Sequence, residues 1–471
     1  MRKTKIICTI GPACNNYETL KKMCLAGMNV ARLNFSHGTY EDHKKNIDLL
    51  KQVRDDLNLP VAILLDTKGP EYRIGSFKDK KVTLKDGDTF TFTTEKIIGD
   101  NTVVSVNYDK LIDELDVGDT ITVNNGLLVF EVISVEGDKA VCRVVNGGEI
   151  SDRKSMSFPG KVLNKEYLSE QDKADILFGI ENDVDFIAAS FVSREQDVRD
   201  IRNFLHENGG DNIDIIAKIE NAAGVDNIYD ICKACEGIMV ARGDLGVEVP
   251  FTQLPAIQKK LITTCRLLGH RVITATEMLE SMINNPRPTR AEISDVANAV
   301  YDGTSAVMLS GETAAGKYPA KTVATMAEIV EETEKNIDYK KWFYETEFKI
   351  KNTLDAISHS ACGVGMDIGA KCIVVCTLSG QTARMVSRFR SPIDIIGMTT
   401  SKKVWYKLAM SWGVTPVMSK PFSSTDVLFY HALESAQSTF ELKTGDKMVV
   451  TGGQTSGASG NTNLIKIETI I

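Results

Sequence analysis

Eight short apolar runs, rich in β-branched residues, recur along the first 312 residues and alternate with amphipathic stretches. Most of the runs are continuous rather than alternating, which is typical of parallel strands buried on both faces. The stretches between them carry apolar residues at helical spacing. The eight runs are residues 4–10, 29–35, 61–67, 185–191, 214–220, 237–244, 271–277 and 306–312. Eight strand–helix units predict an α/β fold built on a (β/α)8 TIM barrel, and spacing alone leaves a doubly wound open sheet as the alternative.

A gap of 117 residues, 68–184, separates the third run from the fourth and is too long for one helix. Its last part has the pattern of the missing barrel helix, with Ser169 as the expected N-cap. The part before it alternates apolar and polar residues between Asp-Gly, Asn-Gly and Glu-Gly pairs, the pattern of antiparallel hairpins. We therefore predict a small β-barrel domain at 70–165, inserted above the mouth of a barrel formed by 1–69 and 166–340.

A third domain of α/β type is predicted for residues 345–471, where five further apolar runs alternate with helical stretches. The first of these runs leads into Ser379, Gly380, Gln381 and Thr382 at a helix start, where free backbone N–H groups can hold an anion. Simple N-capping by Ser379 or Thr382 is an equal alternative. A Gly/Ser/Thr-rich loop at 452–463 could fold over such an anion or merely be flexible.

Composition and charge exclude several classes of protein. The 471 residues are 43% hydrophobic and 25% charged, which is the balance of an ordinary globular protein rather than a disordered or fibrous one. The formal net charge of −8 argues against nonspecific binding to nucleic acid or to an anionic membrane. The apolar runs are too short to span a bilayer, and a signal-peptide pattern is lacking, so we expect a cytoplasmic protein.

The ten cysteines follow no disulfide framework, and the six histidines have no metal-ligand spacing. Cys232 and Cys235 form one C-x-x-C pair, for which a redox or metal role is one interpretation. No second pair completes four zinc ligands, so we expect small buried thiols at the end of a helix.

Polar residues are concentrated where six of the eight runs end. They are Arg32 with Asn34, Asp66 with Thr67, Lys218 with Glu220, Arg242 with Asp244, Thr276 with Glu277, and Ser310 with Glu312. Active sites of TIM barrels lie at the carboxyl ends of the strands. Strand ends also meet solvent and favour polar residues for that reason alone, but solvent does not predict Lys, Glu and Asp converging within neighbouring strands.

Glu220 and Asp244 end two consecutive runs, so their carboxylates should lie within reach of one divalent cation. Two carboxylates completed by substrate and water oxygens are a Mg²⁺ pattern rather than a Ca²⁺ cage. Lys218 is two residues from Glu220 and on the same face of the strand. A cation beside a metal suits charge stabilisation on a phosphoryl group or an enolate. A surface ion pair is the alternative.

Arg32 adds a planar fork suited to phosphate or carboxylate. Asn34, Ser36, Asp66 and Thr67 add oxygen ligands with a single negative charge, a set that could hold a monovalent cation. Spacing leaves K⁺, a second Mg²⁺ and plain hydrogen bonding open.

Several ordered motifs carry a resemblance to a known family. They are TKIICTIGP, GMNVARLNFSHG, LLDTKGPE, AKIEN, MVARGDLGVE, ITATEMLESMINNPRPTRAE, DVANAVYDG and MLSGETAAGKYP. In this order they resemble pyruvate kinase, and the inserted and C-terminal domains fit as well, so the resemblance covers essentially the whole chain. The chain resembles the bacterial type, for which we expect neither a preceding helical segment nor an appended C-terminal domain.

The resemblance implies reversible phosphoryl transfer between phosphoenolpyruvate and ADP, giving pyruvate and ATP. It implies Lys218, Arg32 and Thr276 as catalytic residues, with Arg32, Lys218, Gly243, Asp244 and Thr276 binding the substrate. It implies Glu220 and Asp244 as ligands of Mg²⁺ or Mn²⁺, and Asn34, Ser36, Asp66 and Thr67 as ligands of K⁺. Nucleotide contacts are implied for Asn34, Ser36, His37, Arg73 and Lys154, with a second Mg²⁺ arriving on ADP.

Regulation and assembly also follow from the resemblance. It implies a homotetramer, and an effector at Ser379, Gly380, Gln381 and Thr382 that is a phosphorylated metabolite such as a sugar phosphate or AMP. Glu71, five residues after Asp66, adds negative charge that should favour a free K⁺, whereas relatives with Lys there would carry a tethered cation. Pairing of Glu71 with Lys68 or Arg73 at the hinge is the alternative.

Three positions depart from the family pattern: Glu277 where Gln is common, Ser305 where Asp is usual, and Tyr72 where Ile is common. None removes a metal or phosphoryl ligand.

Two rival functions are weighed against the kinase. A Mg²⁺-dependent barrel lyase or aldolase acting on a pyruvate enolate would need no nucleotide-binding insertion, and a metabolite sensor would need no Lys218, Glu220 and Asp244 set.

Overall fold

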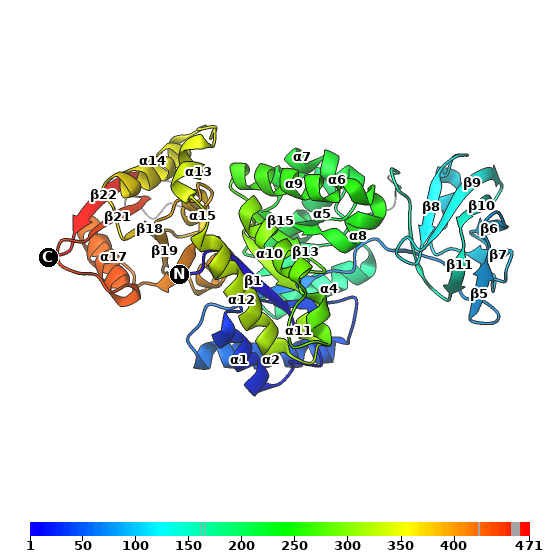
Figure 1. Ribbon diagram of the computed structural model, residues 1–471, viewed down its shortest axis with the longest axis horizontal. Helices are drawn as coiled ribbons and strands as arrows, with labels where there is room; N and C mark the ends of the chain where they lie inside the picture. Colours follow the sequence, from blue (N-terminus) through cyan, green and yellow to red (C-terminus); the bar gives the residue numbers. More distant parts are fainter. Residues whose placement is uncertain (162, 165, 423, 454–461) are drawn as a thin grey trace.

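Figure 1 shows the computed structural model, which describes residues 1–471 except 162, 165, 423 and 454–461. A closed barrel of eight parallel strands lies in the middle of the molecule, between a β-rich part and an α/β part that holds the C-terminus. The TIM barrel with an inserted small β domain and a C-terminal α/β domain is thus confirmed. The doubly wound open sheet is excluded, and the exact domain limits remain predictions.

Each of the eight apolar runs contains one barrel strand. The strands are β1 (Lys5–Thr9), β2 (Val30–Asn34), β3 (Ala62–Asp66), β13 (Phe186–Ala189), β14 (Asp214–Ile219), β15 (Gly237–Ala241), β16 (Arg271–Ala275) and β17 (Ala306–Leu309). The first strand, β1, pairs with both β2 and the last strand, β17, which closes the barrel. Alternate side chains fill the barrel interior, and the others form a second core with the surrounding helices.

The helices around the barrel begin and end at residues suited to those positions. They are α1 (Tyr17–Ala26), α2 (Tyr40–Asp56), α4 (Glu170–Glu181), α5 (Glu195–Glu207), α6 (Ala222–Asp226), α7 (Ile228–Ala234), α8 (Arg242–Glu248), α9 (Leu254–Leu268), α10 (Arg290–Asp302), α11 (Gly311–Ala314) and α12 (Pro319–Lys335). Ser169 is the N-cap of α4, as predicted, and forms a capping box with Asp172. The end of α9 is capped by Gly269 in the left-handed region.

The insertion between β3 and β13 is built from short, mostly antiparallel strands, as the hairpin pattern predicts, although β6 and β7 pair in parallel. Its elements are β4 (Tyr72–Arg73), β5 (Lys81–Leu84), β6 (Thr89–Thr93), β7 (Val103–Ser105), α3 (Leu111–Glu114), β8 (Thr120–Val123), β9 (Leu128–Glu136), β10 (Lys139–Asn146), β11 (Gly148–Ser151) and β12 (Ser155–Ser157). Seven of these strands form a sheet whose two edge strands, β4 and β7, are joined by a bridge between Ile74 and Val106. The sheet therefore curls into a small barrel around Phe90, Phe92 and Phe130. The chain enters through β4 and leaves through β12, and these two strands pair with each other.

The C-terminal part is an α/β layer structure. Its elements are α13 (Tyr339–Glu345), α14 (Thr353–Asp367), β18 (Cys372–Cys376), α15 (Gln381–Ser387), β19 (Asp394–Thr399), α16 (Lys402–Leu408), β20 (Val414–Met418), α17 (Thr425–Thr439), β21 (Lys447–Gly453) and β22 (Thr462–Thr469). The strand order is β20-β19-β18-β21-β22, and β22 is antiparallel to β21. This part covers the amino ends of the barrel strands, where Lys5 of β1 donates to the Val414 carbonyl over 2.8 Å.

The cysteines are buried, including both members of the C-x-x-C pair. Cys232 lies in the last turn of α7, with its Sγ 3.4 Å from Cys265 Sγ on α9. This packing agrees with the expectation of small buried thiols. Within the described ranges, the helices are all too short or too polar to cross a membrane.

Candidate active site

The carboxyl ends of β2, β3, β13 and β14 bring four charged side chains into one buried cluster. Arg32 Nε donates to Asp66 Oδ2 over 2.6 Å, and Lys218 Nζ donates to Asp66 Oδ1 over 3.1 Å. Glu220 Oε1 lies 3.0 Å from the same Lys218 Nζ. Ser190, directly after β13, accepts from Lys218 over 2.7 Å. The cluster therefore holds two cations and two carboxylates around a common centre.

Burial and mutual attraction set the charge states of this cluster. Burial alone would raise the pKa of Asp66, but the charges of Arg32 and Lys218 outweigh burial and lower it. Burial alone would lower the pKa of Lys218, but Asp66 and Glu220 outweigh it and raise the pKa. Lys218 is therefore held as a fixed positive charge, and Asp66 as a fixed negative one.

Glu220 has the properties expected of a metal ligand. Its Oε2 accepts from the Phe191 N–H over 2.6 Å, and Phe191 has a φ of 56°, which aims this N–H at the carboxylate. Its Oε1 is buried and, among the described residues, is paired only with Lys218 and accepts no hydrogen bond. Burial raises the pKa of Glu220 to about 7, with Lys218 opposing and Asp244 and Asp66 adding to the rise. An incompletely satisfied buried oxygen beside negative charge fits a divalent cation.

Asp244 follows β15, the strand next to β14. It was predicted at the end of a strand but lies in a helix. Strand β15 ends at Ala241, so Arg242 and Asp244 belong to the first turn of α8 rather than to a strand end. Arg242 is tied to Asp295 over 2.7 Å and to the Thr276 carbonyl over 2.5 Å, whereas Asp244 is exposed. Over the described ranges, no three His, Cys, Asp or Glu side chains form a metal-ligating group. Glu220 and Asp244 supply two carboxylates, and Mg²⁺ is typically held by one or two carboxylates with substrate and water filling its other coordination positions.

Thr276 and Gly243, both expected to bind the substrate carboxylate, lie in direct contact with each other. The Gly243 N–H donates to Thr276 Oγ1 over 2.9 Å, and that hydroxyl donates to the Ala275 carbonyl over 2.6 Å. Thr276 and Glu277 both have positive φ values, 71° and 55°, so the chain turns sharply after β16 and leaves Glu277 exposed.

The four oxygen ligands proposed for a monovalent cation lie on adjoining strand ends. Asn34 and Asp66 are directly paired residues of β2 and β3. The Asn34 amide oxygen accepts from the Ser36 N–H over 3.1 Å, while Thr67 donates through its hydroxyl to the Ala188 carbonyl over 3.3 Å. The donor set is made only of oxygen atoms, which suits an alkali cation, although Asp66 also serves Arg32 and Lys218.

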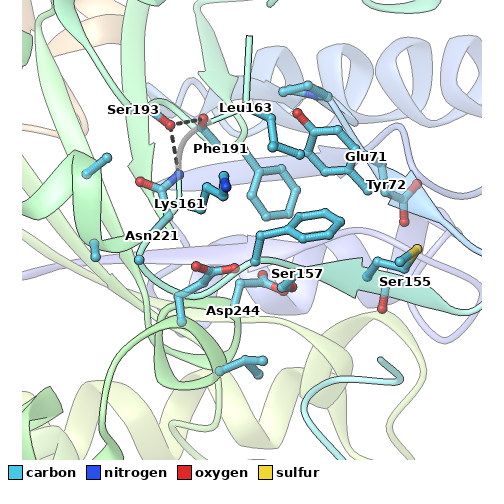
Figure 2. Close-up of a pocket in the computed structure, with 18 of the residues that line it drawn as sticks. Glu71, Tyr72, Ser155, Ser157, Lys161, Leu163, Phe191, Ser193, Asn221 and Asp244 are labelled. Atoms are coloured by element: carbon cyan, nitrogen blue, oxygen red, sulfur yellow. Dashed lines mark hydrogen bonds between the residues drawn. The ribbon is translucent and has the colours of Figure 1, made fainter. Parts of the chain in front are cut away.

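A cleft of about 640 Å³ separates the insertion from the barrel (Figure 2). Tyr72, Ser155 and Ser157 line it from the insertion, and Phe191, Asn221 and Asp244 line it from the barrel. Glu248 of α8 spans the two parts by accepting hydrogen bonds from Ser157 and from the Phe158 backbone. The insertion thus rests on the same helix that carries Asp244.

The basic residues expected at the nucleotide lie at the base of the insertion. Arg73 is on β4, and Lys154 directly precedes β12, the strand that pairs with β4. Arg73 donates to the Arg153 carbonyl over 2.6 Å and forms an ion pair with Glu71. His37 is exposed at the rim of the barrel, beyond β2. These three residues therefore lie outside the buried cluster of Arg32, Asp66, Lys218 and Glu220.

The departures from the family pattern have identifiable surroundings. Tyr72 packs its ring edge-to-face with Tyr108 and Phe158 inside the insertion. Glu71 pairs with both Lys68 and Arg73, so the hinge pairing considered as the alternative role of Glu71 is present. Ser305 is far from the mouth, where its Oγ accepts from Arg390 over 3.0 Å.

The loop 379–382 of the C-terminal part begins α15 without a side-chain cap. Gly380, with a φ of 84°, is the N-cap, so the structure does not show the alternative weighed for this segment, simple N-capping by Ser379 or Thr382. Thr382 is buried and its hydroxyl lies 2.6 Å from that of Thr462. Ser379 and Gln381 are exposed. Residues 454–461 of the predicted covering loop lie outside the described residues.

Two residues of the buried cluster escape the sequence analysis. Ser190 accepts from Lys218 and donates to the Thr67 carbonyl over 2.7 Å, and Thr9 accepts from Arg32 over 3.0 Å. Both end apolar runs in the same way as the predicted residues, which is the signal that could have identified them.

Comparison with known proteins decides the family. The sequence model described as pyruvate kinase, barrel domain, matches residues 1–323, and that described as pyruvate kinase, alpha/beta domain, matches residues 355–468. The chain belongs to the pyruvate kinase family. It is therefore a phosphotransferase, as the motifs imply.

Individual pyruvate kinases match over nearly the full length. A pyruvate kinase of Clostridium acetobutylicum is 46% identical over 472 residues, covering 100% of both chains. One from Staphylococcus epidermidis is 45% identical over 473 residues, covering 100% of this chain and 81% of the relative. A crystal structure of a pyruvate kinase from Cryptosporidium parvum superposes with a TM-score of 0.94 at 39% identity, covering 99% of this chain and 96% of that one.

Proposed function

We propose that the chain transfers the phosphoryl group of phosphoenolpyruvate to ADP, with Mg²⁺ or Mn²⁺ and K⁺ as cofactors. The buried cluster of Arg32, Asp66, Lys218 and Glu220 supports the proposal most directly, because it places fixed cations beside an incompletely satisfied carboxylate. In the reaction the bond from phosphorus to the enol oxygen breaks, and a bond to the terminal oxygen of ADP forms. The enolate then takes a proton to become pyruvate.

Lys218 and Arg32 supply the positive charge that this transfer requires. Lys218, held protonated by its two carboxylate neighbours, faces the negative charge that develops on the phosphoryl group and on the enolate oxygen. Arg32 uses Nε on Asp66 and Nη1 on Thr9, and its Nη2 has no partner among the described residues. These two contacts fix the guanidinium of Arg32, whose remaining N–H groups would donate to a phosphoryl oxygen.

Glu220 and Asp244 would hold the divalent ion, which supplies charge neutralisation for substrate oxygens when bound. Gly243, Asp244 and Thr276 would bind the substrate carboxylate at the first turn of α8. Asn34, Ser36, Asp66 and Thr67 would hold K⁺. Each assignment uses residues that lie at the same mouth of the barrel.

The insertion would act as a lid over the nucleotide. Arg73 and Lys154 lie at its base, and Asn34, Ser36 and His37 lie at or just beyond the carboxyl end of β2, so closure would bring cations onto the nucleotide phosphates and exclude water. We also propose a phosphorylated-metabolite effector at Ser379, Gly380, Gln381 and Thr382, a homotetramer, and a cytoplasmic location, as in the family the chain resembles.

A coupled assay tests the proposed reaction. Pyruvate formation from phosphoenolpyruvate should require ADP, a divalent ion and K⁺, and ATP should appear in equal amount. Pyruvate formed equally well without ADP would favour a lyase or phosphatase activity, and absence of turnover with all components would reject the proposal.

A further inference from the structure

Helix α16 packs both against Gly380 of the 379–382 loop and against the apolar interior of the barrel. Its Trp405 and Tyr406 side chains, with Met410 just beyond the helix, belong to the same apolar cluster as the barrel interior. On its other side, Val404 and Leu408 pack against Gly380. A Cβ atom on Gly380 would lie 3.3 Å from Val404 Cγ1 and 3.4 Å from Leu408 Cδ2. The helix thus contacts the loop and the barrel at once.

Lys403 of α16 holds the start of β13. Its Nζ donates to Asp183 Oδ1 over 2.7 Å and to the Val184 carbonyl over 2.6 Å. It also lies 3.3 Å from Asp185 Oδ1, in the residue that precedes β13. Asp185 is fully buried and accepts the Ile63 N–H of β3 over 2.8 Å, so Lys403 contacts two neighbouring strands through one carboxylate.

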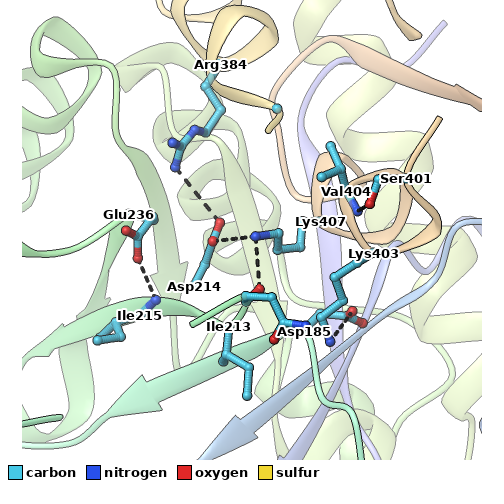
Figure 3. Close-up of polar contacts among 12 residues, drawn as sticks. Asp185, Ile213, Asp214, Ile215, Glu236, Arg384, Ser401, Lys403, Val404 and Lys407 are labelled. Carbon is cyan, nitrogen blue, oxygen red and sulfur yellow. Dashed lines mark hydrogen bonds and ion pairs between the residues drawn. The ribbon is translucent and has the colours of Figure 1, made fainter. Parts of the chain in front are cut away.

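Lys407, one turn later, holds the start of β14 in the same way. Its Nζ donates to Asp214 Oδ1 over 2.8 Å and to the Asn212 carbonyl over 3.0 Å. Asp214 also binds Arg271 over 2.7 Å and lies 3.9 Å from Arg384 of α15, the helix that follows the 379–382 loop. Figure 3 shows Lys403, Lys407 and Arg384 directed at the two aspartates.

Residues of the proposed phosphoryl-transfer site lie at the opposite, carboxyl ends of these two strands. β13 leads to Ser190 and Phe191, whose contacts hold Lys218 and Glu220. β14 runs from Asp214 to Ile219, so Lys218 is four positions after Asp214 and Glu220 directly follows the strand. β13 and β14 are hydrogen-bonded to each other in parallel, with Phe186 opposite Asp214 and Ala189 opposite Ala217, so the two strands would move together.

We propose that α16 couples the 379–382 loop to the phosphoryl-transfer site, with Lys403 and Lys407 as positioning residues for Lys218 and Glu220. The proposal rests on the proposed function and deepens it by naming the element through which the C-terminal part acts. A displacement of the loop against Val404 and Leu408 moves α16, which moves the two ion pairs and hence the far ends of β13 and β14. Close packing between these groups makes such a shift discrete rather than gradual.

Lys407→Met tests the ion-pair half of this coupling, with Lys402→Met as the matched control. Lys402 is on the same helix, but its partner Asp55 lies at the end of α2, and both side chains are largely exposed. Mn²⁺ affinity without substrates reports on Glu220 independently of turnover. Lys407→Met should weaken Mn²⁺ binding and raise the half-saturating phosphoenolpyruvate concentration by roughly three- to tenfold, with kcat changed less than twofold. Lys402→Met should leave both unchanged.

Gly380→Ala tests the loop half. The new methyl group presses on α16, and Gly369→Ala controls for backbone strain because Gly369 also has a positive φ, 65°, with no atom within 4 Å of a Cβ. Gly380→Ala should change Mn²⁺ affinity and speed amide exchange of residues 214–220, and Gly369→Ala should do neither. Equal behaviour of each variant and its control would overturn the coupling.

These measurements test the coupling through α16 independently of the proposed kinase activity. Mn²⁺ affinity and amide exchange do not require the reaction, so they can support α16 coupling even if the wild-type protein makes no ATP. If ATP is made normally and Lys407→Met and Gly380→Ala match their controls, the proposed function stands and the role of α16 is rejected.

Discussion

Lys218 is surrounded by three oxygen atoms from different strands: Asp66 Oδ1, Ser190 Oγ and Glu220 Oε1. Its charge is needed most where negative charge develops during transfer, so Lys218→Met should reduce kcat at saturating phosphoenolpyruvate by at least about 10³-fold. Mn²⁺ binding should be much less affected, since both carboxylates remain. Steady-state kinetics and Mn²⁺ titration check this, and near-normal turnover would remove Lys218 from the mechanism.

The negative charge of Glu71 is the reason to expect a free K⁺ at this site, although Glu71 also forms ion pairs with Lys68 and Arg73. Pairs of this kind stabilise little where they reach solvent, and Glu71 lines the cleft between the insertion and the barrel, where its carboxylate contributes negative charge. Glu71→Lys should reduce the requirement for K⁺, because the ammonium group replaces the charge of the ion. Rates in sodium- and potassium-free buffer, with and without KCl, measure the effect. Glu71→Gln is the control that removes charge without adding a cation, and equal wild-type rates in both buffers would reject the monovalent site.

His270 is predicted to make stability depend on pH. Burial, with the charges of Arg384 and Arg271, lowers its pKa to about 4, against roughly 6.5 in an unfolded chain. Between these values the unfolded chain binds more protons, so stability should fall as pH drops from 6.5 towards 4, by at most about 1.4 kcal/mol per pH unit. Below pH 4 both states are protonated and the dependence ends.

Urea midpoints at several pH values measure the contribution of His270. His270→Gln should flatten the loss of stability on the acid side. His206→Gln is the control, because a hydrogen bond to Asp211 raises the pKa of that exposed histidine, which gives the opposite sign. A wild-type slope retained in His270→Gln would assign the acid sensitivity elsewhere.

The sequence predicted which charged residues lie together in the buried cluster, but it did not predict every residue that hydrogen-bonds to them. Arg32, Asp66, Lys218 and Glu220 stand out because charge is rare in a buried run, and the barrel brings strand ends together. Ser190 and Thr9 are small hydroxyl residues of a kind that is common in protein cores, so their residue type alone does not indicate a functional site. The φ of Phe191, which aims its N–H at Glu220, depends on tertiary contacts and has no local signal.

Among the elements, α4 joins the barrel to the hinge of the insertion. Ser169 accepts from the Asp172 N–H, and Asp172 also accepts from the Gly69 N–H over 2.9 Å. Ser169→Ala should lower the free energy of unfolding by about 1 kcal/mol, the usual value of an N-cap, while kcat stays within twofold. Thermal unfolding and steady-state kinetics check this, with Ser169→Thr as the variant that keeps the cap. A large loss of kcat would mean that the cap also sets the hinge.

Element types were easier to predict than their ends. Eight apolar runs gave eight strands because a strand buried on both faces needs a continuous run. The run at 237–244 extends into the first turn of α8, since Arg242 and Asp244 follow Ala241 without a break in pattern. The turn at Thr276 and Glu277 uses left-handed backbone at two non-glycine residues, which no residue preference predicts.

At the scale of the whole molecule, Arg390 connects the C-terminal part to the barrel without a carboxylate partner among the described residues. It is buried, and burial together with the Arg266 charge holds its pKa well below the usual value. Its Nη2 donates to the Ser305 hydroxyl, which also accepts the Val272 N–H over 3.1 Å. Ser305→Asp would offer both donors a charged acceptor and should stabilise the protein by about 2 kcal/mol. A melting temperature above those of wild type and Ser305→Asn supports this, and one below Ser305→Asn contradicts it.

The pairing of β1 with β17 determines when the barrel can be completed during synthesis. The insertion has all its strands once Ser157 has left the ribosome, whereas β1 waits for Leu309, about 150 residues later. At roughly 5–20 residues per second, the interval is about 8–30 s. Throughout this interval the nascent chain carries a complete insertion on an open barrel, and the edge of β1 that will pair with β17 has no partner strand.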